Sequence, residues 1–256
     1  MAVFVDTHVH LHFPDYREDR EEVIERARAE GIAYFINIGT NLATSREALE
    51  IAHAYEDVYA SAGIHPHDAK DAGAADIAQL EELLKDDKMV AIGEVGLDFF
   101  RNISTPEVQI AFLERFLELQ QRVKKPLVIH CRDAYDKLDE VLASAGGKPY
   151  EGVMHCYSSD REVMKRFLDY GFYISFAGPL TYKKNDALRE ACRACPIDRL
   201  LIETDAPYLP PQSKRGKRNE SAYMLETAEL MAALHGVRLE ALGERITQNA
   251  KELFSL

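Results

Sequence analysis

Short apolar, β-rich runs alternate with longer amphipathic segments along this sequence, from one end to the other. Such an alternation is typical of a parallel sheet whose strands are joined by helices. The candidate strands are residues 3–6, 33–38, 58–63, 89–94, 127–130, 152–155, 172–176 and 200–204. Eight strands are the number that closes a TIM barrel. We therefore predict an α/β fold of the (β/α)8 TIM barrel type.

Signals for the starts and ends of helices fall between these runs. Three pairs fit a capping box, in which a hydroxyl side chain caps the helix and a glutamate follows three residues later. They are Thr44 with Glu47, Ser104 with Glu107, and Ser159 with Glu162. No linker divides the chain, and a length of 256 residues suits one barrel. We predict a single barrel domain over residues 1–256.

The charge balance limits the kinds of partner. The chain has 31 Lys and Arg residues against 43 Asp and Glu residues, a formal net charge of −12. This excludes the broad basic surface of a protein that coats nucleic acid, although a locally basic cleft remains open. The sequence starts with an apolar run that has no charged leader, no stretch approaches membrane-spanning length, and four cysteines are too few for a disulfide framework. We expect reduced thiols, a cytoplasmic location and no membrane partner.

Histidines and carboxylates gather at the ends of the candidate strands, where a TIM barrel carries its catalytic groups. His8 and His10 follow the first run, and their spacing of two places both side chains on one face of an extended backbone. Such a pair can chelate a metal, or it can be a polar strand end that meets solvent. The matching ends of other strands carry Glu94, His130, His155 and Asp205.

These four imidazoles and two carboxylates favour a metal centre. Buried unpaired carboxylates are costly, and a cation is the most economical explanation for them. Six ligands are too many for one tetrahedral Zn²⁺ with an open position, but they suit two metals about 3.5 to 4 Å apart that share a carboxylate and a hydroxide. We therefore expect two divalent metal cations per chain. The mixed ligands favour Zn²⁺, Mn²⁺, Co²⁺ or Ni²⁺ over Mg²⁺, and the identity stays open.

Seven segments extend this pattern over nearly the whole chain. They are residues 6–11 (DTHVHL), 63–67 (GIHPH), 93–98 (GEVGLD), 126–132 (PLVIHCR), 152–155 (GVMH), 203–209 (ETDAPYL) and 215–220 (RGKRNE). In this order the segments resemble the TatD-type metal-dependent deoxyribonucleases, a family of amidohydrolase-like barrels. The resemblance implies a TIM barrel of the metal-dependent hydrolase type.

The resemblance also implies a ligand set for each cation. His8, His10, Glu94 and Asp205 would bind the first metal, and Glu94, His130 and His155 the second, with Glu94 as the bridge. Other binuclear barrels of the wider superfamily have a carboxylated lysine at the position of Glu94. One departure is His12, which stands where many family members have Asp. We expect His12 in a loop or behind the ligands rather than on a metal.

Three further residues lie close to the predicted ligands. His65 ends the third strand and precedes Pro66, which holds the backbone extended and leaves the imidazole at the barrel mouth. We predict a catalytic, substrate-contacting role for His65, and a hydrogen-bonded turn histidine is the alternative. Glu203 and Asp6 share strand parity with ligands two residues away. Each could orient a ligand imidazole or be a buried polar residue of the barrel.

A basic segment follows the eighth strand, with Lys214, Arg215, Lys217 and Arg218 close together. A run of charges is most often a solvated loop. A loop that follows a barrel strand belongs to the catalytic face, however, and a basic rim on an acidic protein suits a phosphate-rich substrate. We predict that Arg215, Lys217 and Arg218 bind substrate together with His65.

These observations together predict a metal-dependent hydrolase, a TatD-type deoxyribonuclease that cleaves DNA phosphodiester bonds on single strands or at ends. A hydroxide activated by two metals would attack phosphorus, Asp205 would orient it or accept its proton, and Glu94 would hold both metals. The same hydroxide could attack a carbonyl, so an amide or ester hydrolase, including one that deacylates aminoacyl-tRNA, is the nearest alternative. A non-catalytic, metal-dependent nucleic-acid-binding protein is the other. We make no prediction of the oligomeric state.

Overall fold

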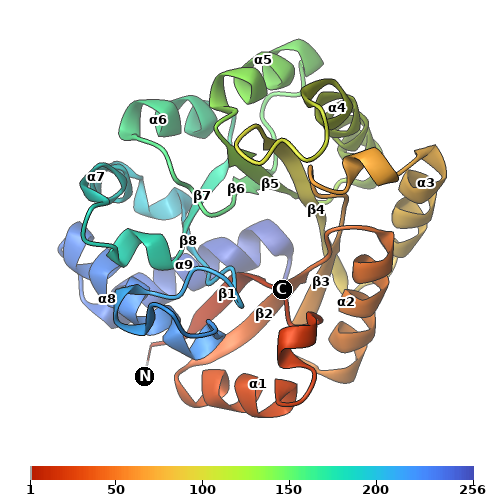
Figure 1. The fold of residues 1–256 in the computed structure, drawn as a ribbon. Coiled ribbons are helices and arrows are strands. Elements are labelled where there is room, and N and C mark those ends of the chain that lie inside the picture. Colours follow the sequence, from red (N-terminus) through yellow and green to blue (C-terminus); the bar gives the residue numbers. More distant parts are fainter. Residues whose placement is uncertain (1) are drawn as a thin grey trace.

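The computed structural model describes residues 2–256, and within this range eight parallel strands form a barrel (Figure 1). Neighbouring strands pair in sequence order from β1 to β8. Their bounds are Phe4–Val9 (β1), Ile32–Ile38 (β2), Val58–Ala62 (β3), Met89–Asp98 (β4), Leu127–Arg132 (β5), Gly152–Met154 (β6), Tyr173–Phe176 (β7) and Leu200–Ile202 (β8). The predicted (β/α)8 fold is confirmed.

Helices surround the barrel. The α-helices are α1 (Arg20–Ala29), α2 (Leu42–Ala54), α3 (Ala74–Leu83), α4 (Pro106–Val123), α5 (Tyr135–Ala145), α6 (Arg161–Asp169), α7 (Asp186–Ala194), α8 (Met224–His235) and α9 (Leu239–Phe254). The short 3-10 helices are η1 (Pro14–Tyr16), η2 (Ala69–Asp71), η3 (Gly178–Thr181), η4 (Ile197–Arg199), η5 (Gln212–Lys214) and η6 (Ser221–Tyr223). The prediction of a single domain over residues 1–256 stays a prediction, and its first residue lies outside the described range.

Aliphatic side chains fill the part of the barrel interior that lies toward the N-terminal ends of the strands. One buried cluster contains Val5, Ile36, Val90, Val128, Val153 and Leu201, which come from β1, β2, β4, β5, β6 and β8. Side chains from strands on all sides of the ring can meet only inside it. Ala250 and Phe254 of α9 join the same cluster, so α9 closes the N-terminal end of the barrel. The opposite, C-terminal end is left for polar residues.

Several strands differ in length from the prediction. The fourth strand runs to Asp98, four residues beyond the predicted end at Glu94, because it pairs with β5 as far as Arg132. Gly96 allows this pairing: a Cβ atom at this position would lie 2.0 Å from the carbonyl oxygen of His130. Glu94 therefore lies four residues before the end of its strand.

The helix caps also differ from the prediction. Asn41 caps α2, and Thr44 is the third helical residue that completes the capping box. Asp160, rather than Ser159, caps α6 by accepting hydrogen bonds from two main-chain N–H groups. Ser104 caps no helix, because its hydroxyl accepts from the main chain of Lys70 and donates to that of His67. Each predicted hydroxyl lies within three residues of the true cap, where tertiary contacts decide which side chain is used.

Hydrogen bonds between β1 and the end of β8 close the barrel. Val9 and Ala206 form an isolated parallel bridge, and the His10 N–H donates to the Ala206 carbonyl at 2.8 Å. The Asp205 N–H donates to the His8 carbonyl at 2.9 Å. Three of the predicted metal ligands are thus carried by the segments that join the two ends of the sheet.

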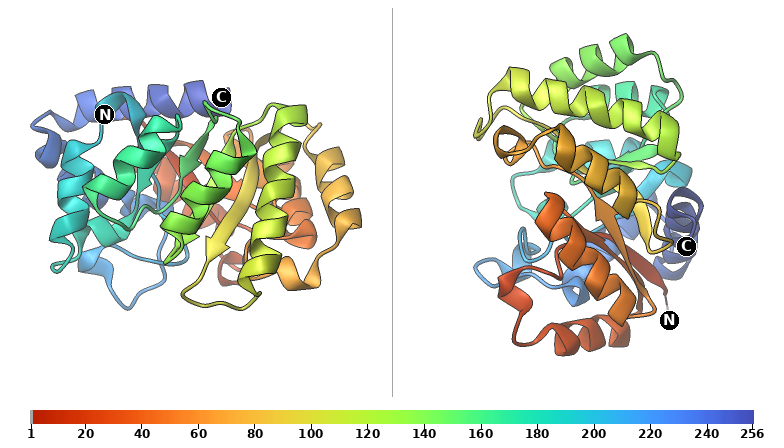
Figure 2. Two further views of the ribbon diagram at one scale, coloured as in Figure 1. Left: turned by 90° about the horizontal axis from the view of Figure 1, so that it is seen from above. Right: turned by 90° about the vertical axis from the view of Figure 1, so that its right-hand side faces the viewer.

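The loops that follow β4 and β8 project from one face of the barrel, while the two chain ends lie at the other (Figure 2). The face with the loops is the C-terminal face of the strands, which is the face that carries the site in TIM barrels. Among residues 2–256, none of the helices combines the length and the apolar character that crossing a bilayer requires.

Candidate metal centre

All six predicted metal ligands converge at the C-terminal end of the barrel. They are His8 of β1, His10 just after it, Glu94 of β4, His130 of β5, His155 after β6 and Asp205 after β8. Three groups of donors have their ligand atoms within 4.8 Å of one another: His8, His155 and Asp205; His8, His10 and Glu94; and His65, Glu94 and His130. The structure therefore brings the predicted residues together from five strands.

One half of the centre is built around the two histidines of the first motif. The Nε2 atoms of His8 and His10 lie 3.3 Å apart. The Oδ1 atom of Asp205 lies 3.6 Å from the first and 3.5 Å from the second. His10 Nδ1 faces the carbonyl oxygen of Ile38 at 2.9 Å and so carries the proton in neutral His10. Its Nε2 lone pair is then directed into the centre.

Glu94 lies between the two halves. Its Oε2 atom is 3.4 Å from His8 Nε2. Its Oε1 atom is 2.8 Å from His130 Nδ1, 3.1 Å from His155 Nε2 and 3.5 Å from His65 Nε2. The two oxygens of one carboxylate thus serve two different sets of imidazoles. This is the arrangement that a bridging ligand needs.

The charges of the site are strongly coupled. Burial raises the pKa of Glu94, but the imidazoles of His155, His65 and His8 outweigh burial and hold the pKa well below its usual value. Burial lowers the pKa of His155, yet the carboxylates of Glu203 and Glu94 outweigh it and place the pKa well above its usual value. The buried carboxylate therefore stays ionised and draws positive charge to its surroundings.

The donors fit a divalent transition-metal ion. His8 Nδ1 is buried without a hydrogen-bond partner, and its Nε2 faces a second imidazole nitrogen and two carboxylates. Two neutral imidazoles cannot both donate a proton to the same space, whereas a cation accepts lone pairs from all of these atoms. Imidazole nitrogens with carboxylate oxygens are the donor set of Zn²⁺, Mn²⁺, Co²⁺ and Ni²⁺ sites.

Glu203 and Asp6 hold the centre in different ways. Glu203 Oε1 accepts from His155 Nδ1 at 2.9 Å and from the Cys156 N–H at 2.7 Å, so it orients a ligand imidazole. Asp6 accepts instead from the hydroxyl groups of Thr204 and Ser221, at 2.6 and 2.7 Å. Burial raises the pKa of Asp6 to about 6 in spite of these bonds. Of the two roles that the sequence left open, Glu203 takes the first and Asp6 the second.

Two residues of the site, Asp98 and His67, were not among the predicted site residues. Asp98 Oδ2 accepts from His67 Nε2 at 2.9 Å and lies 3.3 Å from His130 Nε2, so one buried carboxylate connects two histidines. Strand parity could have found it, because Glu94 and Asp98 lie four positions apart in one strand and so share a face. The prediction missed Asp98 because it ended the strand too early.

His12 lies behind the ligands, as expected. Its ring is buried, and its Nδ1 is 3.0 Å from the side-chain oxygen of Asn37. The same oxygen accepts from the Leu11 N–H at 2.9 Å. Asn37 therefore fixes the turn that follows the histidine pair and holds His12 within it.

Two of the three predicted substrate-binding residues in the basic loop after β8 contact other side chains of the protein. Both terminal guanidinium nitrogens of Arg218 bond to the Asp19 carboxylate, with Nη1 at 2.8 Å from Oδ1. The Arg215 guanidinium lies 4.5 Å from the centre of the Tyr182 ring. Lys217 is exposed. The three predicted substrate-binding residues thus differ in how free their charges are.

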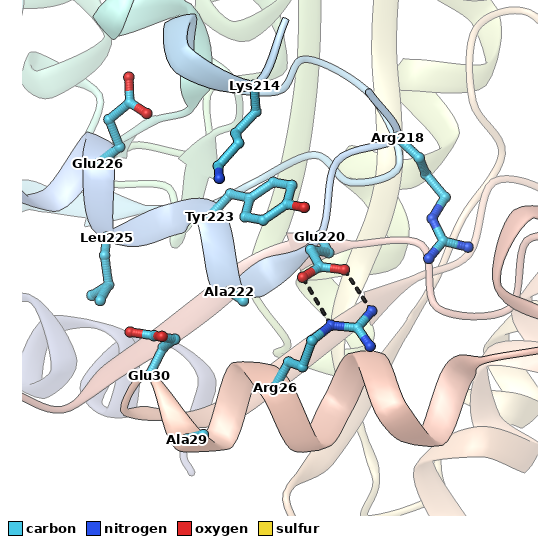
Figure 3. A pocket seen from close by; sticks show the side chains of 10 residues that line it. All are labelled: Arg26, Ala29, Glu30, Lys214, Arg218, Glu220, Ala222, Tyr223, Leu225 and Glu226. Atoms are coloured by element: carbon cyan, nitrogen blue, oxygen red, sulfur yellow. Dashed lines mark hydrogen bonds and ion pairs between the residues drawn. The ribbon is translucent and has the colours of Figure 1, made fainter. Parts of the chain in front are cut away.

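A groove between α1 and the segment 214–226 lies beside this loop (Figure 3). Arg26 and Glu220 form a two-point ion pair across it, with Nη2 at 2.7 Å from Oε2. The Lys214 ammonium lies over the Tyr223 ring at 4.9 Å from its centre. The ion pair between Arg26 and Glu220 therefore holds the segment against α1.

Comparison with known proteins identifies relatives of this chain. The sequence model of the family described as "TatD related DNase" matches residues 5–255. The chain is 39% identical to "Uncharacterized metal-dependent hydrolase YabD" of Bacillus subtilis, over 98% of both chains. It is 37% identical to "3'-5' ssDNA/RNA exonuclease TatD" of Erwinia billingiae, again over 98% of both. The crystal structure of YJJV, a TatD homologue from Escherichia coli, has a TM-score of 0.93 and 29% identity, and the match covers 99% of this chain and 98% of that one. The chain therefore belongs to the TatD-related DNase family.

Proposed function

We propose that this protein is a metal-dependent nuclease that hydrolyses phosphodiester bonds in single-stranded DNA or at DNA ends. The observation that carries the proposal is the position of Glu94, whose two oxygens face separate sets of imidazoles. Two-metal centres with a shared carboxylate are suited to phosphodiester hydrolysis. The names of the relatives, a metal-dependent hydrolase and an ssDNA/RNA exonuclease, support the same reaction class.

The proposed centre holds two divalent cations, of which Zn²⁺, Mn²⁺, Co²⁺, Ni²⁺ and Mg²⁺ are the candidates. The first set of ligands is His8, His10, Glu94 and Asp205, and the second is Glu94, His130 and His155. When bound, such cations lower the pKa of a bound water and neutralise charge that develops on phosphoryl oxygens. Glu203 and Asp98 keep His155 and His130 in place for this task.

Asp205 is the proposed proton acceptor. Its side chain is 15% exposed, against 4% for Glu94, so it is the carboxylate of the centre that water reaches most easily. The hydrogen bond from its own N–H to the His8 carbonyl fixes the backbone beneath it. A carboxylate held in this way can orient an attacking water and take its proton.

His65, Arg215 and Lys217 are the proposed phosphate contacts. His65 lies at the edge of the centre, with a side chain that is 13% exposed. Arg215 and Lys217 are exposed on the loop after β8. Arg218 can contribute charge from its pair with Asp19, but less freely.

We also propose that the protein works in the cytoplasm, where thiols such as that of Cys131 stay reduced.

The test is hydrolysis of an end-labelled single-stranded oligonucleotide by the purified protein, with each of the five metals in turn. We expect metal-dependent cleavage that is lost in Asp205→Asn. RNA, an aminoacylated tRNA and a neutral ester serve as parallel substrates. Turnover of the acyl substrates without turnover of DNA would replace the nuclease by an acyl hydrolase, and metal-dependent DNA binding without any turnover would replace it by a binding protein.

A further inference from the structure

Two loops at the C-terminal face of the barrel carry exposed apolar side chains. Phe100 is 57% exposed and Tyr208 is 54% exposed, and Ile103 is also exposed. Phe100 and Ile103 lie on the loop that follows β4, and Tyr208 lies on the loop that follows β8. Most aromatic side chains of this size are buried in a barrel protein, so two exposed ones on the face of the metal centre suggest a ligand with flat, apolar surfaces.

The strand order places these two aromatic rings on opposite sides of the mouth. β4 and β8 are separated by three strands in either direction around the ring, because β1 meets the end of β8 through the bridge between Val9 and Ala206. Figure 1 shows β4 and β8 across the barrel from each other. Figure 2 shows the loops that follow them on the same face. The predicted metal ligands lie at the C-terminal end of the barrel, on the face from which both loops project.

Phe100 lies against an exposed arginine. The guanidinium carbon of Arg132, the last residue of β5, lies 3.9 Å from the centre of the Phe100 ring. Arg132 and the neighbouring Arg101 are both exposed. An aromatic ring beside arginines can stack on a nucleobase while the charges attract the phosphate backbone.

Tyr208 is fixed relative to the metal centre. Its N–H donates to the Asp205 carbonyl at 2.9 Å, and its own carbonyl accepts from the Asn219 side chain at 2.7 Å. Its ring centre lies 6.3 Å from that of His10 and 6.0 Å from that of Phe13. The ring is therefore held next to a predicted ligand by the backbone that carries the predicted proton acceptor.

We propose that Phe100 with Arg132, and Tyr208 on the opposite side, are two base-stacking surfaces that hold unpaired nucleobases on either side of the cleaved phosphate. This inference rests on the proposed nuclease function and makes its substrate specific. In a duplex the bases are already stacked on one another, so only a single strand or a frayed end can place its bases on both rings. Stacking accepts every base, so the surfaces select for strandedness and not for sequence.

The test combines protein variants with altered substrates. The variants are Phe100→Ala and Tyr208→Ala, with Phe100→Tyr and Tyr208→Phe as conservative partners that keep a ring. Val237→Ala truncates an exposed apolar side chain after α8 and serves as the matched control. Each protein is given a single-stranded oligonucleotide and the same oligonucleotide with abasic residues on both sides of the cleaved bond. Affinity for both is also measured by fluorescence anisotropy without added metal.

Each alanine variant should raise KM and the metal-free Kd for the normal strand roughly 5- to 100-fold, the range of one lost stacking contact. For the abasic strand the same variants should equal the wild type, and the conservative variants should bind both strands as the wild type does. Equal affinity of wild type and alanine variants for the normal strand would overturn the inference, as would equal losses on both strands.

Failure of the nuclease proposal has a different signature. If the wild type cleaves neither strand, the nuclease assignment falls, and the metal-free affinities still decide whether the rings stack on bases. If the wild type cleaves and binds normal and abasic strands equally, the nuclease assignment stands and the stacking surfaces do not.

Discussion

The main-chain N–H of Asp205 donates a hydrogen bond to the carbonyl oxygen of His8 at 2.9 Å. This bond joins the end of β8 to β1, so it closes the barrel and at the same time sets the spacing between two predicted metal ligands. Residues that follow the last strand and residues of the first strand thus meet in a register that the backbone dictates. Closure of the barrel and the spacing of these two residues therefore depend on the same contact.

Glu94→Gln should lose most bound metal and all measurable turnover. The amide cannot offer two anionic oxygens to two sets of imidazoles, and the replacement leaves His155 beside one carboxylate fewer. Metal content of the purified proteins, measured by plasma mass spectrometry, checks the first effect and oligonucleotide cleavage the second. Glu47→Gln, an exposed change on α2, is the control. Full metal content in Glu94→Gln would contradict the bridging role.

Asp205→Asn should lower kcat by about 100-fold or more and change substrate affinity far less. The amide cannot accept a proton, and loss of one general base typically costs this much in rate. Single-turnover kinetics with a separate binding measurement divide the two effects. Without metal, the melting temperature should stay close to that of the metal-free wild type, because the bond that closes the barrel belongs to the main chain.

Glu203→Gln should weaken metal binding without unfolding the protein. Glu203 accepts from His155 and from the Cys156 N–H, and the amide oxygen can keep these bonds but not the charge that makes the imidazole a better ligand. Such a change behind a ligand typically costs about 10- to 100-fold in metal affinity. Competition with a chromophoric chelator measures it, and wild-type affinity in the variant would remove Glu203 from this role.

Lys217→Ala and Arg218→Ala should have different consequences. Loss of a free phosphate contact at Lys217 should lower the slope of log K against log[salt] by roughly 0.7 on a single strand. Arg218→Ala should mainly loosen the loop, because both terminal guanidinium nitrogens bond to Asp19. Its effect on stability should be at most about 1 kcal/mol, since the pair is about one-third exposed. Asp19→Asn is the matched variant: it should cost similar stability and leave the charge of Arg218 free for phosphate.

Removal of metal should lower the melting temperature. A cation that binds only the folded state adds about 2.7 kcal/mol at a free concentration 100 times its Kd. For a chain of this size that corresponds to a shift of about 5 to 10 °C. Calorimetry with a chelator, and again after the metal is restored, measures the shift. Glu94→Gln should show little of it, and an equal shift in that variant would place the stabilising metal elsewhere.

Local patterns were sufficient to predict the fold and the kinds of side chain that meet at the C-terminal end of the barrel. The alternation of apolar runs and helical segments predicted the barrel, and the strand-end positions of residues such as His8, Glu94 and His155 predicted which side chains would meet. The reason is that the C-terminal ends of parallel strands face the same side in every TIM barrel. A position at a strand end therefore translates directly into a place in the site.

Tertiary structure decided what each atom faces. The end of β4 depends on its pairing with β5. Because β4 continues to Asp98, this residue belongs to the site and Glu94 is not the last residue of the strand. Arg218, read as a free cation, pairs with Asp19 across 199 positions of sequence. Ion pairs and strand ends of this kind depend on distances that exist only after the chain has closed into a ring. The sequence by itself thus determined the barrel and the kinds of metal-binding side chain at its C-terminal end. The closed ring decided which imidazoles face the same carboxylate oxygen and which charged side chains remain unpaired.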